Sequence, residues 1–197
     1  MTKHAETFVP HASEHWLRRY YLGRAAFSLV WVALALTLGR QLPMLGAALL
    51  VIYPAWDAAA NSVDAASNGG LARNRSQAIN VVISALTTVL VIVTSSIGPS
   101  AVLSVFGGWA IVSGLLQLTT AVRRWRLAGA QWAMVLSGAQ SALAGGAFLL
   151  QAQQATPPVL ATVAGYAGFG AVYFLISAIA LWVWRKGATA ETVAIRR

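Results

Sequence analysis

The sequence predicts an all-α membrane protein with six transmembrane helices, arranged as three tandem parallel helical hairpins. Of its 197 residues, 58% are hydrophobic and only 10% are charged, whereas a soluble domain carries about 25% charged residues. Residues 79–93 and 159–183 contain no charge at all. Because roughly 20 apolar residues of helix cross the hydrocarbon core of a bilayer, lipid is the expected solvent of these segments.

Short connections that contain Gly, Pro or polar residues separate the expected spans. Pro43, Pro99 and Pro158 fall at the starts of the second, fourth and sixth spans, where a missing N–H costs no helical hydrogen bond. Gly98-Pro99 is expected to be a turn, because residues 77–122 are too many for a single crossing. The expected spans are 22–38, 42–64, 77–97, 99–122, 131–150 and 159–184 within a transmembrane domain over 22–186, flanked by tails over 1–21 and 187–197.

The basic residues predict the orientation of the spans. Thirteen of the 14 Lys and Arg residues fall in or beside the two tails and the second and fourth connections, and only Arg40 lies on the other side. Because cytoplasmic segments carry an excess of Lys and Arg, both termini are expected in the cytoplasm. The positive-inside distribution of Lys and Arg thus accounts for the net charge of +9. The expected partner is the lipid bilayer, and no nucleic acid is expected.

An aromatic pattern recurs in the three even-numbered spans: an aromatic residue, two small residues or Pro, then a second aromatic residue. A basic residue follows each copy on the predicted cytoplasmic side. Two crossings return the chain to the same side, so the three copies are expected to be parallel. The hairpins cover about 22–66, 75–122 and 130–185, and the aromatic pairs are Tyr53 and Trp56, Phe106 and Trp109, and Tyr166 and Phe169.

These three two-helix units, with prolines opening the even helices and Gly-rich aromatic centres, resemble the HdeD-like acid-resistance membrane proteins of bacteria. The resemblance covers roughly residues 20–187. It implies a multi-pass protein of the bacterial inner membrane with a link to acid stress, and it supplies no catalytic residues. The polar run over 56–64 departs from the mostly apolar hairpins of that family.

This polar run is the most informative local feature of the sequence. Asp57, Asn61 and Asp64 are spaced four and three residues apart, so they lie on one face of a helix. A charged Asp at mid-bilayer costs roughly 2.5–3.5 kcal/mol on insertion scales, so it should face the bundle and find a partner. Arg24 in the first span is the expected partner of Asp57 or Asp64. The same leaflet supplies the other members of the cluster, Gln77, Asn80 and Gln117.

Two interpretations of this cluster stay open. It is either a structural clamp, in which Arg24 ties the first helix to the second and the amides fasten the third, or a polar, proton-responsive pocket that opens to the cytoplasm. The clamp is the favoured interpretation. By alignment of the aromatic pairs, Gln117 occupies in the second hairpin the place that Asp64 has in the first.

Rows of small residues in the fourth and fifth spans predict close helix packing. In lipid, such rows let helix backbones approach one another. We expect contacts within the bundle, with a homo-oligomer or another membrane protein as the alternative partner. The rows are Ala110 and Gly114; Ser137, Ser141 and Gly145; and Gly138, Ala142 and Gly146.

Nothing in the sequence indicates an enzyme, a metal site or a cofactor. The chain has no Cys, which excludes thiolate chemistry, and His11 and His15 in the N-terminal tail lack a third ligand. The sequence therefore predicts a membrane protein without catalytic turnover, with a structural or interaction role. The alternative is a proton or small-solute channel or transporter that uses the face of Asp57, Asn61 and Asp64.

Overall fold

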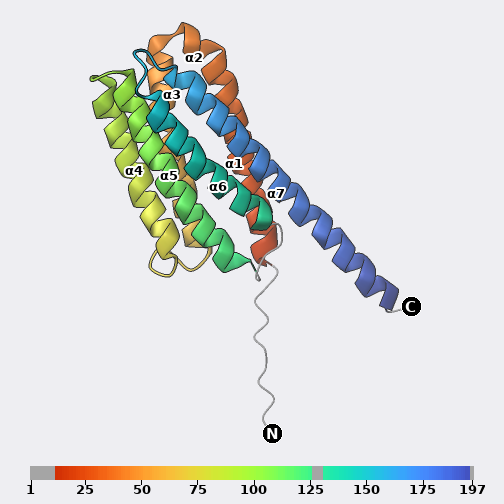
Figure 1. Cartoon of the computed structure of the whole chain (residues 1–197). Helices are drawn as coiled ribbons and strands as arrows, with labels where there is room; N and C mark the ends of the chain where they lie inside the picture. The colour runs from red at the N-terminus through yellow and green to blue at the C-terminus, as the bar shows by residue number, and fades with distance from the viewer. Residues whose placement is uncertain (1–11, 126–130, 196–197) are drawn as a thin grey trace.

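The computed structural model describes residues 12–125 and 131–195, and the regular structure of these residues is entirely helical. The helices lie side by side in a bundle, with α2 at one end and α7 projecting past the other (Figure 1). Within the described residues, six helical segments are long and apolar enough to cross a membrane. This confirms the predicted fold class. The helices are α1 (Ala12–Leu36), α2 (Leu38–Gln41), α3 (Pro43–Ser67), α4 (Arg75–Ser95), α5 (Pro99–Arg124), α6 (Gln131–Gln151) and α7 (Val159–Ile195).

The two terminal helices extend beyond the spans predicted from the sequence. Helix α1 begins at Ala12, inside the predicted N-terminal tail, because Leu17 and Tyr21 are buried against α7. The ring centroids of Tyr21 and Phe174 lie 5.9 Å apart. Helix α7 continues to Ile195, so most of the predicted C-terminal tail is a continuation of the last helix.

The predicted turns lie where the prolines and glycines placed them. Helix α3 begins at Pro43 and α5 begins at Pro99, while Pro158 directly precedes α7. Gly98 has a φ of 142°, a conformation that residues with a side chain rarely adopt. The chain therefore reverses at Gly98-Pro99, and α4 and α5 are two separate spans.

A proline also lies inside α3, where α1 supports the helix. Pro54 has no N–H, so the carbonyl of Leu50 lacks its helical donor. One residue earlier, Trp31 Nε1 of α1 donates to the carbonyl of Leu49 over 2.8 Å. The ring of Trp31 also packs on Tyr53, with 4.8 Å between ring centroids. Contacts from α1 thus stabilise the turn of α3 that the proline weakens.

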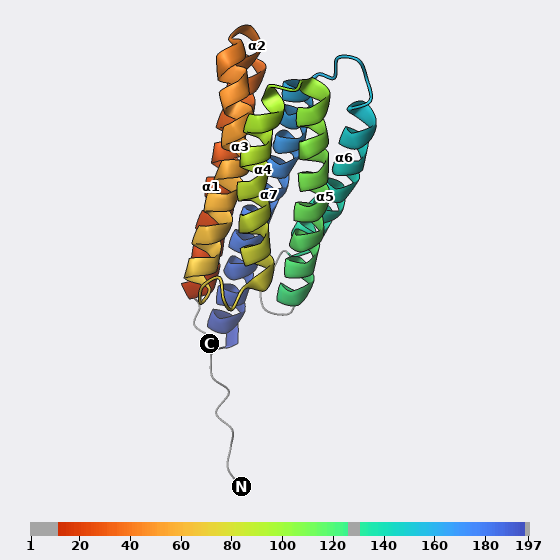
Figure 2. The same ribbon diagram turned by 90° about the vertical axis from the view of Figure 1, so that its left-hand side faces the viewer.

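The helices pack most extensively across the boundaries of the predicted hairpins. Helix α1 packs on α7, α3 on α4, and α5 on α6, while α7 also touches α3 and α5. In both views, α1 begins and α7 ends at the end of the bundle where α3 is joined to α4 (Figures 1 and 2). The second and fourth spans, α3 and α5, thus both touch the sixth span, α7. The threefold hairpin repeat itself stays a prediction from the sequence.

Helices α5 and α6 meet backbone to backbone through glycines. A Cβ atom on Gly114 would lie 2.6 Å from the carbonyl oxygen of Gly138, and one on Gly145 would lie 2.5 Å from that of Gly107. Such distances leave no room for a side chain. The predicted packing of small residues within the bundle is thus confirmed at these positions, whereas Gly146 of the parallel row has nothing within 4 Å of its Cβ position.

The interior of the bundle has an apolar half and a polar half. The half nearer α2 is filled by an apolar core, and the half nearer the α3–α4 connection buries hydroxyl, amide and carboxylate side chains. The outer surface is rich in exposed apolar residues such as Met44 and Leu143, as expected of helices in contact with lipid. Core residues of the apolar half include Trp31, Leu49, Val91, Leu103, Phe106, Phe148 and Val163.

The glycine contact between α5 and α6 leads to a stability prediction. We expect Gly145→Ala to lower the stability of the bundle by about 1–3 kcal/mol, because the added methyl group pushes two backbones apart. The neighbouring Gly146→Ala is the matched control. It should be neutral or stabilising by up to about 1 kcal/mol, since alanine is the better helix former. Thermal unfolding in one detergent, followed by circular dichroism, measures both, and equal unfolding midpoints would contradict the close contact.

Candidate functional site

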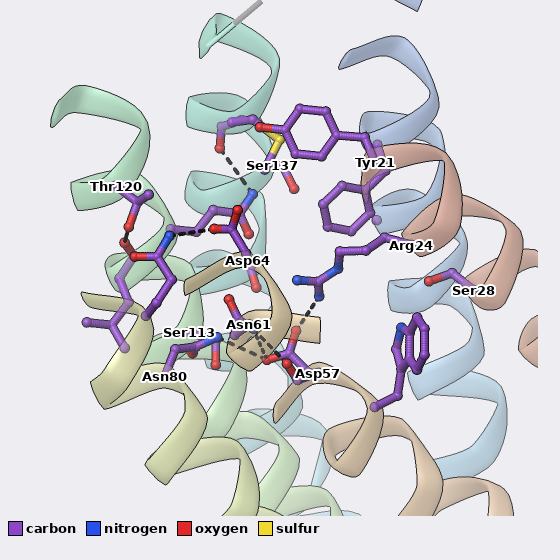
Figure 3. A pocket seen from close by; sticks show the side chains of 18 of the residues that line it. Tyr21, Arg24, Ser28, Asp57, Asn61, Asp64, Asn80, Ser113, Thr120 and Ser137 are labelled. Carbon is purple, nitrogen blue, oxygen red and sulfur yellow. Dashed lines mark hydrogen bonds and ion pairs between the residues drawn. The ribbon is translucent and has the colours of Figure 1, made fainter. Parts of the chain in front are cut away.

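The polar half of the bundle is centred on the carboxylate of Asp57 in α3, whose residue is 7% exposed. Oδ1 of Asp57 pairs with the guanidinium of Arg24 from α1. Oδ2 accepts hydrogen bonds from Asn61 Nδ2 and Asn80 Nδ2, each over 3.0 Å, and from Ser84 Oγ over 2.8 Å. Of the two carboxylates predicted as partners of Arg24, Asp57 is the one it pairs with, and Figure 3 shows the donors converging on Asp57.

Helical spacing brings these donors to one point. Asn61 lies one turn after Asp57 and also donates to its backbone carbonyl over 2.8 Å. Asn80 and Ser84 are four residues apart on α4, so both side chains share one face of that helix. Sequence analysis identified Asn80 but missed Ser84, because a serine in an apolar span is as often a small packing residue as a polar donor.

Trp109 of α5 extends the hydrogen bonds around Asp57 by one member. Trp109 Nε1 donates to Ser84 Oγ over 2.9 Å. The indole N–H only donates, so Ser84 accepts from it, and the Ser84 hydroxyl donates to Asp57. Every partner of the carboxylate is then a donor.

Arg24 ties α1 to both α3 and α7. Besides its ion pair with Asp57, it donates through Nη1 to the hydroxyl of Tyr20 over 3.1 Å. Its guanidinium carbon lies 4.5 Å from the ring centroid of Phe174 in α7. A cation within about 6 Å of an aromatic centroid is attracted to the face of the ring. The arginine is thus held by charge, hydrogen bonding and an aromatic face together.

The second carboxylate of the cluster, Asp64, joins α3 to α4 about two turns away from Asp57. It accepts hydrogen bonds from Gln77 Nε2 over 2.8 Å and from Asn68 Nδ2 over 2.9 Å. Gln77 Oε1 in turn accepts from Ser76, whose hydroxyl accepts from Thr120 of α5 over 2.9 Å. The amides therefore fasten the third span to the second, as the clamp interpretation expects.

Gln117, the last member of the predicted cluster, fastens a different pair of helices. Its Nε2 donates to the backbone carbonyl of Met134 in α6 over 3.2 Å. It lines the same pocket as Asp57 and Asp64, but its amide serves the α5–α6 contact. The predicted equivalence of Gln117 and Asp64 stays a prediction from the sequence, and the two residues fasten different pairs of helices.

Three aromatic rings from the even-numbered spans meet where the polar half ends. The centroids of Tyr53 and Trp109 are 5.8 Å apart, those of Tyr53 and Tyr166 are 6.4 Å apart, and those of Trp109 and Tyr166 are 6.0 Å apart. All three pairs have the edge-to-face geometry that aromatic quadrupoles favour. We call these rings the aromatic triad. Phe106 packs edge-on against Trp109 from the apolar side.

Besides Phe106, two aromatic residues of the predicted pairs lie outside this triad. Trp56 is half-buried and stacks on Phe27 of α1 with 4.3 Å between centroids, and Phe169 is 61% exposed. The three pairs therefore do not occupy equivalent positions. Tyr53 and Trp109 each lie ten residues after the proline that opens their helix, whereas Tyr166 lies eight residues after Pro158.

The polar side chains enclose a partly open pocket with a volume of ≈ 100 Å³. A cavity needs only roughly 10–15 Å³ on this scale to hold one water molecule, so the pocket has room for several waters or one small molecule. The aromatic triad closes it toward the apolar core. Among the atoms of its lining side chains, Asn80 Oδ1, Ser113 Oγ and Trp56 Nε1 are buried without a hydrogen-bond partner in the protein.

Within residues 12–125 and 131–195, no group of three or more His, Cys, Asp or Glu side chains could hold a metal ion. His11 of the histidine pair noted in the sequence lies outside these residues.

Comparisons with known proteins return no match. No family model matches the chain, and neither a curated protein nor a solved structure matches it. The resemblance to the HdeD-like proteins stays an expectation from the sequence. The geometry of the polar half is the basis for inferring a function.

The ion pair between Arg24 and Asp57 predicts strong coupling between the two residues. Arg24→Met or Asp57→Leu alone leaves one charge without its partner, so each is expected to lower the free energy of unfolding by about 3–5 kcal/mol. The double variant should be less destabilised than the sum of the two, by roughly 0.5–3 kcal/mol. Reversible unfolding in detergent measures the cycle, with the exposed Arg19→Met as the control. Strictly additive effects would show that the pair is not coupled.

The bond from Trp109 to Ser84 predicts a smaller effect. We expect Trp109→Phe to keep the aromatic contacts and to lose one buried hydrogen bond, which lowers stability by about 0.5–1.5 kcal/mol. Trp132→Phe, at a tryptophan that is 49% exposed, is the control and should change little. Thermal unfolding compares the two, and an equal response of both variants would contradict a structural role for this hydrogen bond.

Proposed function

We propose that this chain is a multi-pass protein of the bacterial inner membrane that acts without catalytic turnover, in a structural or interaction role connected with stress resistance. Its six apolar helices support the membrane location. The bacterial origin and the link to acid stress come from the resemblance of its hairpins to the HdeD-like proteins. The proposal places both termini in the cytoplasm.

The distribution of basic residues over the bundle supports this orientation. Arg40 belongs to α2, at the end of the bundle opposite the α3–α4 connection. An excess of basic residues marks the cytoplasmic ends of spans. The end where α1 begins and α7 ends carries Arg18, Arg19, Arg73, Arg75 and Arg123.

The observation that supports a structural role is the complete set of donors around Asp57. The donors come from α1, α3 and α4, and Ser84 extends the set to α5 through Trp109. A buried carboxylate whose two oxygens both receive donors from neighbouring helices holds those helices in one packing arrangement. In lipid, where burial of apolar surface gives little drive, hydrogen bonds between helices add to their association. The cluster thus acts as a clamp on four helices.

A second candidate function is a channel or transporter for protons or a small solute along the face of Asp57, Asn61 and Asp64. The pocket favours it, since these three residues line a polar space that is open in part. The aromatic triad and the apolar core fill the rest of the axis. Transport would therefore require the apolar half to open.

Flux measurements distinguish the two functions. In liposomes that contain the purified protein, we expect proton leak at the level of protein-free liposomes, because the apolar half separates the pocket from the opposite end. A pH-sensitive dye inside the vesicles, with valinomycin to balance charge, reports the leak. Proton or solute flux that is abolished by Asp57→Asn and retained in Gly146→Ala would establish the transporter instead.

The stress role is tested by survival of an acid-sensitive bacterium that expresses the chain. Expression should raise survival after acid challenge, and variants of the clamp should lose this effect in proportion to the folded protein left in the membrane. An unchanged survival at normal expression would contradict the stress role. A variant that is folded at the normal level and yet fails to protect would contradict a purely structural role of the clamp.

A further inference from the structure

The pocket beside Asp57 holds polar atoms that the bundle leaves without partners. Asn80 is 9% exposed, and its Nδ2 donates to Asp57 while its Oδ1 is buried without a partner. Rotating the amide by 180° would turn Oδ1 toward the carboxylate, acceptor against acceptor, so Asp57 fixes the orientation. Buried polar atoms in native proteins nearly always have a partner, which is often a water or a bound molecule.

A second atom of the same kind lies on the neighbouring helix. Ser113 Oγ of α5 is also buried without a hydrogen-bond partner and lines the same pocket as Asn80. Figure 3 shows Ser113 and Asn80 on the same side of Asp57, on adjacent helices. Two oxygen atoms that are free to accept thus border one space, and a molecule with N–H donors would satisfy both.

The rest of the lining favours a positively charged occupant. Its charged side chains are the two carboxylates of Asp57 and Asp64 and the one guanidinium of Arg24. The aromatic triad supplies the inner wall, and the faces of such rings attract cations. Phe174, another aromatic residue of the lining, already holds a cation, since the guanidinium carbon of Arg24 lies 4.5 Å from its ring centroid.

We propose that the pocket binds a small organic ammonium ion. Its N–H groups donate to Asn80 Oδ1 and Ser113 Oγ, and its carbon atoms pack on the aromatic triad. The volume of ≈ 100 Å³ limits its size, because a cavity of about 150 Å³ holds benzene and its six carbon atoms. The site goes beyond the structural role proposed above and does not depend on it, since the Asp57 carboxylate has its donors without a ligand.

Methylammonium chloride is the probe for this site. Titrated into the purified full-length protein in detergent, it should produce saturable heat in calorimetry and a rise in the unfolding midpoint that follows the binding curve, because a ligand of the native state stabilises it by mass action. Sodium chloride at the same concentration controls for ionic strength, and acetamide controls for an uncharged N–H donor of similar size. Neither should reproduce the effect.

Variants of Ser113 locate the binding. Ser113→Ala removes an oxygen that has no partner in the protein, so the bundle should stay folded while methylammonium binds about two- to tenfold more weakly. Ser113→Leu fills the pocket and should abolish binding without loss of the folded state. Ser177→Ala is the matched control, because Ser177 Oγ is also buried without a partner but does not line the pocket.

Three results would overturn the proposal. The first is that methylammonium shows no saturable binding, and the second is that sodium chloride or acetamide produces an effect equal to that of methylammonium. The third is that Ser113→Leu binds methylammonium with the affinity of the unchanged protein. In the first case the pocket holds water only. If Ser113→Leu does not fold, the comparison of Ser113→Ala with Ser177→Ala decides alone. Each of these results leaves the coupling of Arg24 with Asp57 untouched, so failure of the ammonium site is distinguishable from failure of the clamp.

Discussion

The buried ion pair between Arg24 and Asp57 is the interaction on which the arrangement of the polar half depends. A carboxylate at this depth needs donors from all sides, and α3 alone supplies only Asn61. The others come from α1 and α4, so the charge can be satisfied only when these helices lie at one rotation and one depth. Ser84 passes the same constraint to α5 through Trp109.

The two halves of the bundle hold the helices together by different physical means. Hydrogen bonds and the ion pair of Arg24 with Asp57 fix the polar half, where side chains reach across gaps between helices. Interlocking rings and side chains fill the apolar half, and along α5 and α6 the glycines bring backbone against backbone. Hydrogen bonds specify which side chains pair and in which direction, whereas close apolar packing specifies the distance between helices. The pocket lies in the polar half, where the hydrogen-bonded side chains leave space that no apolar side chain fills.

Much of the fold and part of the site could be predicted from the sequence. Long apolar segments and helix-opening prolines gave the six spans, and the spacing of Asp57, Asn61 and Asp64 gave the buried face. The ion pair followed because few charges exist at that depth. Ser84 and Ser113 could not be predicted, since the sequence does not distinguish a serine that faces lipid from one that belongs to a buried polar network. Helix rotation, which the sequence does not reveal, decides that Phe169 faces outward while Tyr166 joins the aromatic triad.

The one-way line of hydrogen bonds from Trp109 through Ser84 to Asp57 has an electrical consequence. A chain that conducts protons by successive hops needs every member both to give and to take a hydrogen. The indole of Trp109 donates a hydrogen and has no lone pair to accept another. Proton transfer along this line of hydrogen bonds therefore cannot continue past Trp109. A charge thus sits deep among the spans without offering protons a route along this line toward the opposite leaflet.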